Sequence, residues 1–282
     1  MNSTFENKTC VITGAAGGIG RELALGLARQ GARLAISDVD EDGLAKTQQD
    51  AEALGAKVHA MRLDVADHAA IYEYADIVKA EFDAVHQLYN NAGISGMGEL
   101  TDMPIDMIQR VIDINLMGVL HGSRAFLPLL KESGQGTLVN ISSLNGFAGM
   151  PGLPIYCATK FAVRGLTDAL RSDAMFHGDP VQIVCVHPGG IKTNIANANV
   201  AQLSEMPPET HALRNRQHDL YQNKFLTYPA DKAAQDILNG VARGKTRIVI
   251  THEAKALDWL TRFFPIRYQK ILNRRMQREL AP

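Results

Sequence analysis

A regular alternation of two hydrophobic patterns constrains the fold of this sequence more than any other feature. Short runs rich in β-branched residues alternate with longer stretches in which apolar residues recur every three or four positions. This order predicts strand–helix–strand units, which pack as a parallel sheet between two layers of helices. The predicted strands are Thr9–Thr13, Arg33–Ser37, Lys57–Leu63, Gln87–Tyr89, Thr137–Ile141, Val181–Val186 and Thr246–Ile250. The predicted helices are Ile19–Gln30, Asp42–Leu54, His68–Phe82, Pro104–Lys131, Ile155–Met175 and Ala230–Arg243. We therefore expect an α/β chain with a doubly wound sheet of seven parallel strands.

Two segments depart from the alternation. Residues 194–228 are long, polar and dotted with single apolar residues, which favours a lid over a simple connection. Residues 251–282 form a basic, amphipathic extension that Pro265 divides into two short helical stretches. We expect residues 1–250 to form one catalytic domain that includes the lid, with the extension packed on it or on a partner subunit. The alternative is that the extension contacts an anionic membrane surface.

Composition narrows the function classes. The chain has 29 basic and 30 acidic residues, so its net charge of -1 gives no reason to expect nucleic-acid binding. Three widely spaced cysteines fit reduced thiols in a cytoplasmic protein, and the polar N-terminus does not resemble a secretory signal. No run of apolar residues is long enough to span a bilayer, and the nine histidines show no metal-ligand spacing. We expect no metal.

A glycine-rich turn links the first strand to the first helix. Residues 13–20 read TGAAGGIG, and Gly14, Gly18 and Gly20 would let backbone N–H groups and the N-terminus of the helix approach a pyrophosphate. Ile19 opens that helix. The alternative is a turn that only packs the helix on the strand. Asp38, at the end of the second strand, can accept hydrogen bonds from an adenosine ribose and would repel a 2′-phosphate, so we expect NAD and not NADP.

Further motifs follow in a fixed order along the chain. They are Asp64-Val65, Asn90-Asn91-Ala92-Gly93, Asn115, Ser142-Ser143, Tyr156-x-x-x-Lys160 and Pro188-Gly189. Together with the glycine turn, these motifs resemble the short-chain dehydrogenase/reductase family over residues 5–250. The resemblance implies a Rossmann fold, a nicotinamide cofactor and an oxidoreductase activity on alcohols and ketones.

Four residues match the catalytic positions of that family. Tyr156 and Lys160 are four positions apart on a predicted helix, so their side chains share one face, and a nearby ammonium group lowers the pKa of a phenol. By resemblance, Tyr156 is the acid/base, and Lys160 tunes it and binds the nicotinamide ribose. The resemblance also implies that Ser143 positions the reacting oxygen and that Asn115 holds a water molecule in a proton relay.

The resemblance assigns the remaining matches to the cofactor. Asp64 and Val65 would flank the adenine. Asn91, Ala92 and Gly93 would let the backbone pass close to the dinucleotide. The segment after the sixth strand would hold the carboxamide, through residues that include Pro188, Gly189, Ile191 and Thr193. All these positions follow strands, where ligands bind in open parallel sheets.

The substrate is less constrained. Residues 144–153 (LNGFAGMPGL) and the expected lid supply leucine, phenylalanine and methionine without an evident basic clamp. We therefore expect a hydrophobic secondary alcohol or ketone such as a steroid, retinoid or lipid-like molecule. Two alternatives are a 3-oxoacyl thioester reductase and a non-catalytic NAD(H)-binding sensor or scaffold. The resemblance further implies a homo-oligomer, either a tetramer or a dimer.

Overall fold

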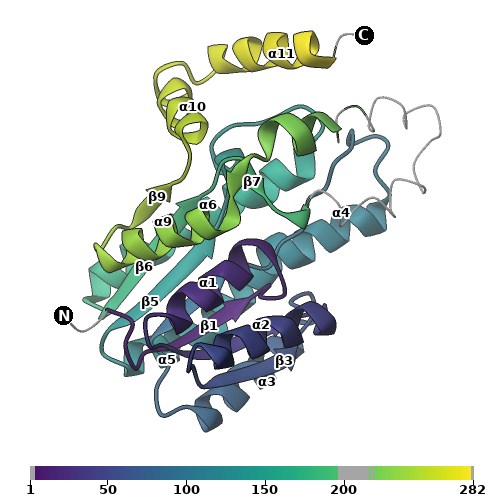
Figure 1. Cartoon of the computed structure of the whole chain (residues 1–282). Helices are drawn as coiled ribbons and strands as arrows, with labels where there is room; N and C mark the ends of the chain where they lie inside the picture. Colours follow the sequence, from purple (N-terminus) through teal and green to yellow (C-terminus); the bar gives the residue numbers. More distant parts are fainter. Residues whose placement is uncertain (1–3, 196–215, 217–218, 281–282) are drawn as a thin grey trace.

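A seven-stranded parallel sheet forms the centre of the computed structural model, which describes residues 4–195, 216 and 219–280. The strands lie in the order β3-β2-β1-β4-β5-β6-β9 (Figure 1). Their bounds are Thr9–Thr13 (β1), Arg33–Asp38 (β2), Val58–Arg62 (β3), Gln87–Asn90 (β4), Gly136–Ile141 (β5), Val181–His187 (β6) and Arg247–Val249 (β9). The predicted doubly wound α/β fold and all seven predicted strands are confirmed, with ends that differ by no more than two residues.

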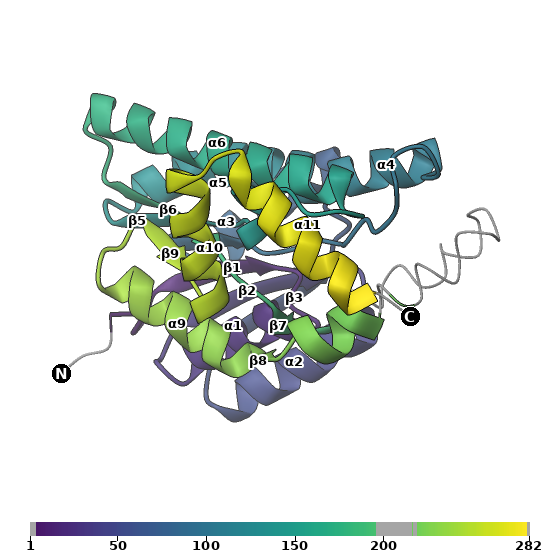
Figure 2. The same cartoon turned by 90° about the horizontal axis from the view of Figure 1, so that it is seen from above.

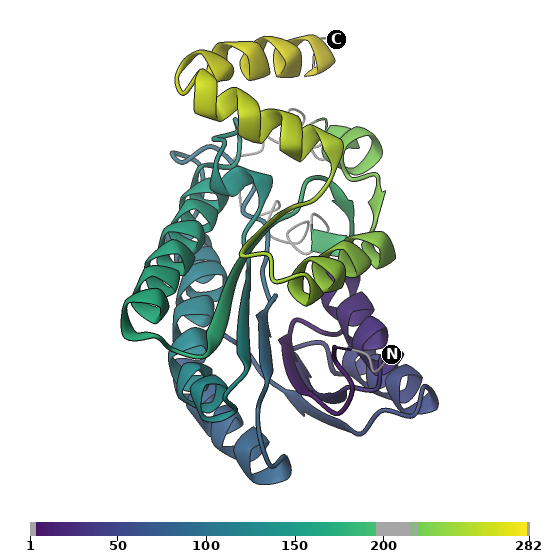
Figure 3. The ribbon, with the colours of Figure 1, turned by 90° about the vertical axis from the view of Figure 1, so that its left-hand side faces the viewer.

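Helices cover both faces of this sheet (Figure 3). On one face, buried residues of α1 (Gly18–Ala28), α2 (Glu41–Ala53) and α9 (Ala230–Ala242) form a single cluster with the strands. On the other face, α3 (His68–Glu81), α5 (Gly118–Glu132) and α6 (Pro154–His177) contribute to a second cluster. Strands β1 and β5 are buried along their whole length because helices cover both faces of the sheet, as expected for a parallel sheet.

The order of the strands places the functional site. Strand β1 pairs with β2 on one side and β4 on the other, so the chain changes direction across the sheet between β1 and β4. A crevice forms at such a switch point, outside the carboxyl ends of the strands. The glycine turn follows β1, and Asn91 follows β4, so both motifs reach this crevice.

The structure divides the predicted helix 104–131 into two α-helices and a π-helical turn between them. A π-helical turn over Asp113–Met117 separates α4 (Ile105–Ile112) from α5. The sequence period does not reveal this turn, which widens the helix by one residue where Asn115 lies.

The chain continues beyond the sheet into two further helices. Helix α10 (His252–Phe263) and helix α11 (Arg267–Leu280) lie on either side of Pro265 and pack over the carboxyl end of the sheet (Figure 2). A second, two-stranded sheet joins β7 (Ile191–Lys192) to β8 (Tyr228–Pro229), which the sequence did not predict. Most of the predicted lid lies outside the described residues; its described end contains a π-helical turn over Tyr221–Phe225.

Candidate active site

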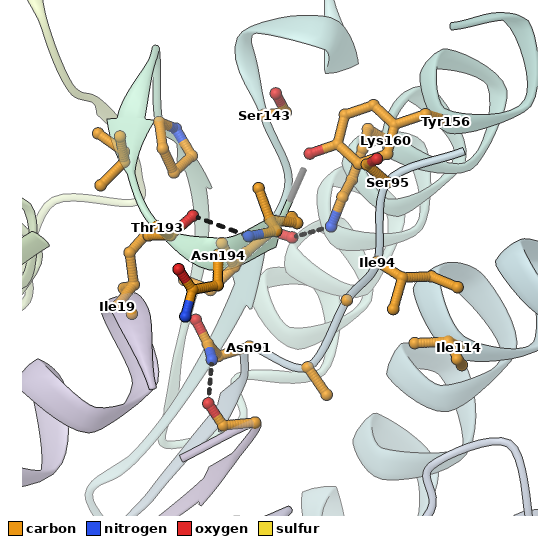
Figure 4. Close-up of a pocket in the computed structure, with 18 of the residues that line it drawn as sticks. Ile19, Asn91, Ile94, Ser95, Ile114, Ser143, Tyr156, Lys160, Thr193 and Asn194 are labelled. Carbon is orange, nitrogen blue, oxygen red and sulfur yellow. Dashed lines mark hydrogen bonds between the residues drawn. The ribbon is translucent and has the colours of Figure 1, made fainter. Parts of the chain in front are cut away.

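A cavity of about 690 Å³ lies at the switch point of the sheet. It collects residues from the carboxyl ends of β1, β2, β3, β4 and β5, from the segment that follows β6, and from the segment that precedes β8. All but two of the residues predicted to be catalytic or cofactor-binding line its wall; the exceptions are Gly20 and Asn115. Figure 4 shows Ile19 of the glycine turn on one side of this cavity and Ser143, Tyr156 and Lys160 on the other.

The glycines of the turn have different structural roles. Gly14 has a φ of 70°, and a Cβ atom there would lie 2.8 Å from the Cα atom of Ala92. Gly20 lies beneath the turn, where a Cβ atom would lie 2.0 Å from the carbonyl oxygen of Gly14. A Cβ atom on Gly17 would meet no atom within 4 Å. Gly20 is therefore a packing glycine, whereas Gly17 faces open space in the cavity wall.

The turn fits the phosphate groups of a dinucleotide. Gly17 is the N-cap of α1, and no side chain caps that helix end. Gly18 and Ile19, in the first turn, line the cavity, so this helix end faces the cavity with unpaired backbone donors that favour an anion. The amide of Asn91 fixes the turn from the other side by donating 3.0 Å hydrogen bonds to the carbonyls of Thr13 and Gly14.

Two carboxylates, those of Asp38 and Asp64, line the cavity. Asp38 accepts a 2.9 Å hydrogen bond from the N–H group of Ala16, which fixes its carboxylate beside the glycine turn. Asp64 accepts hydrogen bonds from Ala66 N–H and from the guanidinium of Arg110 at 2.8 Å. Burial opposes ionisation of Asp64, but these two donors outweigh it and hold its pKa below the usual range. The sequence analysis missed Arg110, which also lines the cavity and lies 46 positions away.

Tyr156 and Lys160 lie one turn apart at the start of α6, and the hydroxyl of Tyr156 points into the cavity between Ser143 and the Lys160 amine (Figure 4). The Lys160 amine donates a 3.0 Å hydrogen bond to the carbonyl of Ile141 and lies 5.7 Å from the centre of the Tyr156 ring. Burial lowers the pKa of Lys160 to about 8. Burial also raises the pKa of Tyr156 to about 12, although a hydrogen bond with Ser143 opposes the rise.

The sequence predicted that Lys160 would lower the pKa of Tyr156. In the folded protein burial is the largest influence on this pKa and raises it, and the group that lowers it is the hydrogen-bonded Ser143. The phenol is therefore protonated at neutral pH. A further positive charge beside the ring would be needed to bring its pKa down.

Asn115 lies behind the catalytic residues and not in the cavity wall. Its amide oxygen accepts a 2.8 Å hydrogen bond from the N–H group of Ile94, and its amide nitrogen donates a 2.8 Å bond to the carbonyl of the same residue. A Cβ atom on Gly93 would lie 3.2 Å from the Asn115 oxygen and 3.5 Å from the Lys160 nitrogen. Asn115 and Lys160 therefore meet at Gly93, where an added side chain would crowd both.

Buried polar contacts fix the strand end that carries Ser143. The Nδ1 atom of His187 lies 2.9 Å from the carbonyl oxygen of Ser143. Because a carbonyl can only accept, Nδ1 carries the proton. Ser142 donates a 2.8 Å hydrogen bond to the carbonyl of Lys160 and so ties β5 to α6. These contacts position the serine and the lysine relative to one another.

A second group of cavity residues is apolar, and we call it the apolar end. It comprises Met97, Leu144, Met150, Leu153, Ile195, Phe225 and Leu226, of which Met97, Met150 and Leu153 pack in one cluster with Tyr156. The hydroxyl of Tyr268, in α11, accepts a 3.1 Å hydrogen bond from the N–H group of Gly149 and so fixes the loop that carries Met150. This contact joins positions 119 residues apart, so the sequence pattern could not reveal it.

No group of three or more His, Cys, Asp or Glu side chains in residues 4–195, 216 and 219–280 is placed to hold a metal ion. None of the helices in these ranges has the length and hydropathy needed to cross a bilayer.

The fold and the site together define a class of protein. A doubly wound parallel sheet with a glycine turn at its switch point, facing a buried Tyr–Lys pair and a serine, is a Rossmann-type dinucleotide-binding oxidoreductase site. The family model described as short chain dehydrogenase matches residues 8–204. The chain therefore belongs to the short-chain dehydrogenase/reductase family and is an oxidoreductase that acts on alcohols or ketones with a nicotinamide cofactor.

Individual relatives agree with this family. The chain is 48% identical over 271 residues to SadH, a Mycobacterium tuberculosis protein named as an oxidoreductase, and the match covers 96% of this chain and 95% of SadH. It is 37% identical over 195 residues to a 3-alpha-(or 20-beta)-hydroxysteroid dehydrogenase of the same species, with 68% and 72% of the two chains covered. A short-chain dehydrogenase/reductase from Burkholderia phymatum, solved in complex with NAD, superposes with a TM-score of 0.84 at 31% identity and 95% coverage of both chains.

Proposed function

We propose that the protein is an NAD-dependent dehydrogenase that interconverts hydrophobic secondary alcohols and ketones, such as steroid, retinoid or lipid-like molecules. The observation that carries this proposal is the apolar end of the cavity, three of whose residues pack in one cluster with Tyr156. Met97, Met150 and Leu153 offer a substrate dispersion contacts and no charge to bind a carboxylate or a phosphate. The similarity to a hydroxysteroid dehydrogenase also favours a bulky apolar substrate.

Tyr156 is the proposed acid/base. During reduction its hydroxyl donates a proton to the carbonyl oxygen of the substrate, and during oxidation its phenolate takes the proton of the alcohol. A pKa near 12 keeps the phenol protonated at pH 7, so the proton that reduction requires is in place before the reaction. Ser143, whose carbonyl is held by His187, orients the substrate oxygen toward this hydroxyl. The nicotinamide ring, when bound, supplies or accepts the hydride and in its oxidised form carries a positive charge.

Lys160 and Asn115 complete the proposed machinery. The amine of Lys160, fixed by the Ile141 carbonyl, would bind the nicotinamide ribose and carry protons toward Tyr156. A pKa near 8 lets this amine gain and lose a proton close to neutral pH. Asn115 holds the backbone of Ile94 and thereby positions the end of the relay.

Asp38 supports the choice of NAD. Its carboxylate stands beside the glycine turn, where an adenosine ribose would lie in the proposed binding mode. Two charges 4 Å apart interact by about 1 kcal/mol in water, so a 2′-phosphate with nearly two charges is disfavoured by about 2 kcal/mol. This energy corresponds to about a 30-fold preference for NAD.

The test is turnover by the purified protein. We expect formation of NADH from NAD with steroid, retinoid or long-chain secondary alcohols, and a loss of at least 1,000-fold in the Tyr156→Phe variant. Asp38→Ala should reduce the preference for NAD over NADP by about 30-fold. Reduction of acyl thioesters with NADPH would instead favour a 3-oxoacyl thioester reductase. Tight NADH binding without turnover of any alcohol or ketone would favour a sensor or scaffold.

We further propose that the enzyme is a cytoplasmic homo-oligomer, as a tetramer or a dimer. The free, buried thiols of Cys10, Cys157 and Cys185 suit a reducing compartment. The half-exposed side chain of Phe161 on α6 supports an interface on the outer surface of that helix. Light scattering of the purified protein measures the number of subunits.

A further inference from the structure

The outer surface of α10 and α11 combines exposed aromatic residues with a concentration of positive charge. Five of the thirteen exposed large hydrophobic side chains among the described residues lie between positions 259 and 271. They are Trp259, Phe263, Phe264, Ile266 and Ile271. The rings of Trp259 and Phe263, one helical turn apart, stack with their centres 5.5 Å apart. We call these five residues the apolar face.

The inward sides of the two helices already have a partner. Leu257 and Leu260 of α10, with Tyr268 and Leu272 of α11, pack in one cluster around Phe147. Because both helices direct their buried sides to the same cluster, their opposite sides form one outer surface. The apolar face therefore lies outside this cluster, and its exposure to water is unfavourable.

Positive charge is segregated onto the same surface. Residues 261–282 contain six basic residues and one acidic residue, whereas the rest of the chain contains 23 basic and 29 acidic residues. Arg267, Lys270 and Arg274 are exposed and recur every three or four positions, so they share the side of α11 opposite Tyr268 and Leu272. The one acidic residue, Glu279, is paired with Lys224.

We propose that this surface binds the headgroups of an anionic phospholipid bilayer, with the apolar face inserted at the boundary with the acyl chains. Arginine and lysine beside tryptophan and phenylalanine suit this boundary, because the charges bind lipid phosphates while the rings leave water. A second copy of the chain is a poorer occupant, because two surfaces of the same positive charge would repel each other.

The position of α11 connects this surface to the proposed catalysis. The helix runs from Tyr268, which holds the loop of Met150, to Glu279, which pairs with Lys224 next to the cavity residue Phe225 (Figure 2). Helix α11 thus bridges two segments that line the apolar end of the cavity. Binding to a bilayer would place that end of the enzyme next to the phase in which an apolar alcohol dissolves.

The test uses the full chain and needs no turnover, so its result is independent of the proposed function. Trp259 is the only tryptophan in the sequence, so its fluorescence reports directly on the apolar face. We expect a blue shift and flotation of the protein with vesicles of phosphatidylcholine containing 30% phosphatidylglycerol. Pure phosphatidylcholine vesicles should have little effect, and 0.5 M salt should weaken binding to the anionic vesicles.

Two variants and a matched control separate the contribution of the basic residues to binding from that of the apolar face. Reversal of three charges, in Arg267→Glu/Lys270→Glu/Arg274→Glu, should weaken binding at least 100-fold, because each basic residue near the surface contributes about fivefold. Trp259→Ala/Phe263→Ala should weaken binding at least tenfold, as judged by flotation. Met175→Ala/Phe176→Ala should leave binding unchanged. These two control residues are 77% and 85% exposed, against 64% and 66% for Trp259 and Phe263, and they lie at the end of α6.

Three outcomes would overturn the proposal. The first is the absence of both flotation and a blue shift with the anionic vesicles. The second is binding that survives the charge reversal. The third is a blue shift that depends on protein concentration without vesicles, which would identify a second copy of the chain as the occupant of the surface.

Discussion

Replacement of Gly20 by alanine is expected to destabilise the domain by about 4 kcal/mol. The added Cβ atom would lie 2.0 Å from the Gly14 carbonyl oxygen and 2.5 Å from the amide nitrogen of Asn91. Overpacking against backbone costs about 3 kcal/mol, and displacement of the two hydrogen bonds of Asn91 costs about 2 kcal/mol more. The higher helix propensity of alanine offsets about 1 kcal/mol of this destabilisation.

Thermal unfolding followed by circular dichroism measures this effect. For a chain of this size, about 4 kcal/mol corresponds to a fall in Tm of roughly 8–16 °C. The matched control is Gly17→Ala, in the same turn, where a Cβ atom meets nothing within 4 Å and the backbone is extended. The Tm of this control should stay within about 1 °C of the wild type.

The same pair of variants separates packing from cofactor binding. The methyl group of Gly17→Ala would project toward the space proposed for the pyrophosphate, so this variant should bind NAD at least tenfold more weakly while it keeps its stability. Equal Tm values for the two variants would refute the assignment of Gly20 to packing and Gly17 to the cavity wall.

Three further predictions concern residues that support the site. Tyr268→Phe should raise the KM for apolar alcohols about threefold to tenfold with little change in kcat, because the loop at Gly149 loses its hydrogen bond. Steady-state kinetics measure this change, and an unchanged KM would contradict the prediction. Asn115→Ala should lower the free energy of unfolding by about 3 kcal/mol in urea titrations, since the N–H and C=O groups of Ile94 would lose their buried partners. Burial lowers the pKa of His187 to about 4. Between pH 6.5 and pH 4 the histidine is therefore protonated in the unfolded chain but neutral in the folded chain. The stability of the folded chain consequently falls as the pH falls through this range. Between pH 7 and pH 4.5 the free energy of unfolding should fall by roughly 2 to 3 kcal/mol because of His187, and this part of the fall should be absent in His187→Asn. If the free energies of unfolding of the two proteins fell in parallel with pH, His187 would be ruled out as the cause.

Much of the site could be predicted because its residues follow strands. Once the alternation of hydrophobic patterns places Thr13, Asp38 and Asn90 at the carboxyl ends of neighbouring parallel strands, the residues after them must meet at one edge of the sheet. The spacing of Tyr156 and Lys160 likewise fixes their shared helix face. The parallel strands and the meeting of these motifs at one edge of the sheet are thus consequences of local sequence.

Other features depend on packing between segments that the sequence does not link. The π-helical turn at Asn115, the pairing of Asp64 with Arg110 and the hydrogen bond from Gly149 to Tyr268 have no periodic signal. The pKa of Tyr156 belongs to the same group. The sequence placed a lysine beside the phenol, but only the folded chain shows how much solvent both groups lose.

The sequence by itself therefore determined which residues meet at the catalytic edge, because strand and helix periods are local properties of the chain. The tertiary structure decided the balance of forces on those residues and the shape of the substrate end. It also decided that α10 and α11 turn their aromatic and basic side outward. These properties depend on burial and on contacts between distant segments, which exist only once the chain has folded.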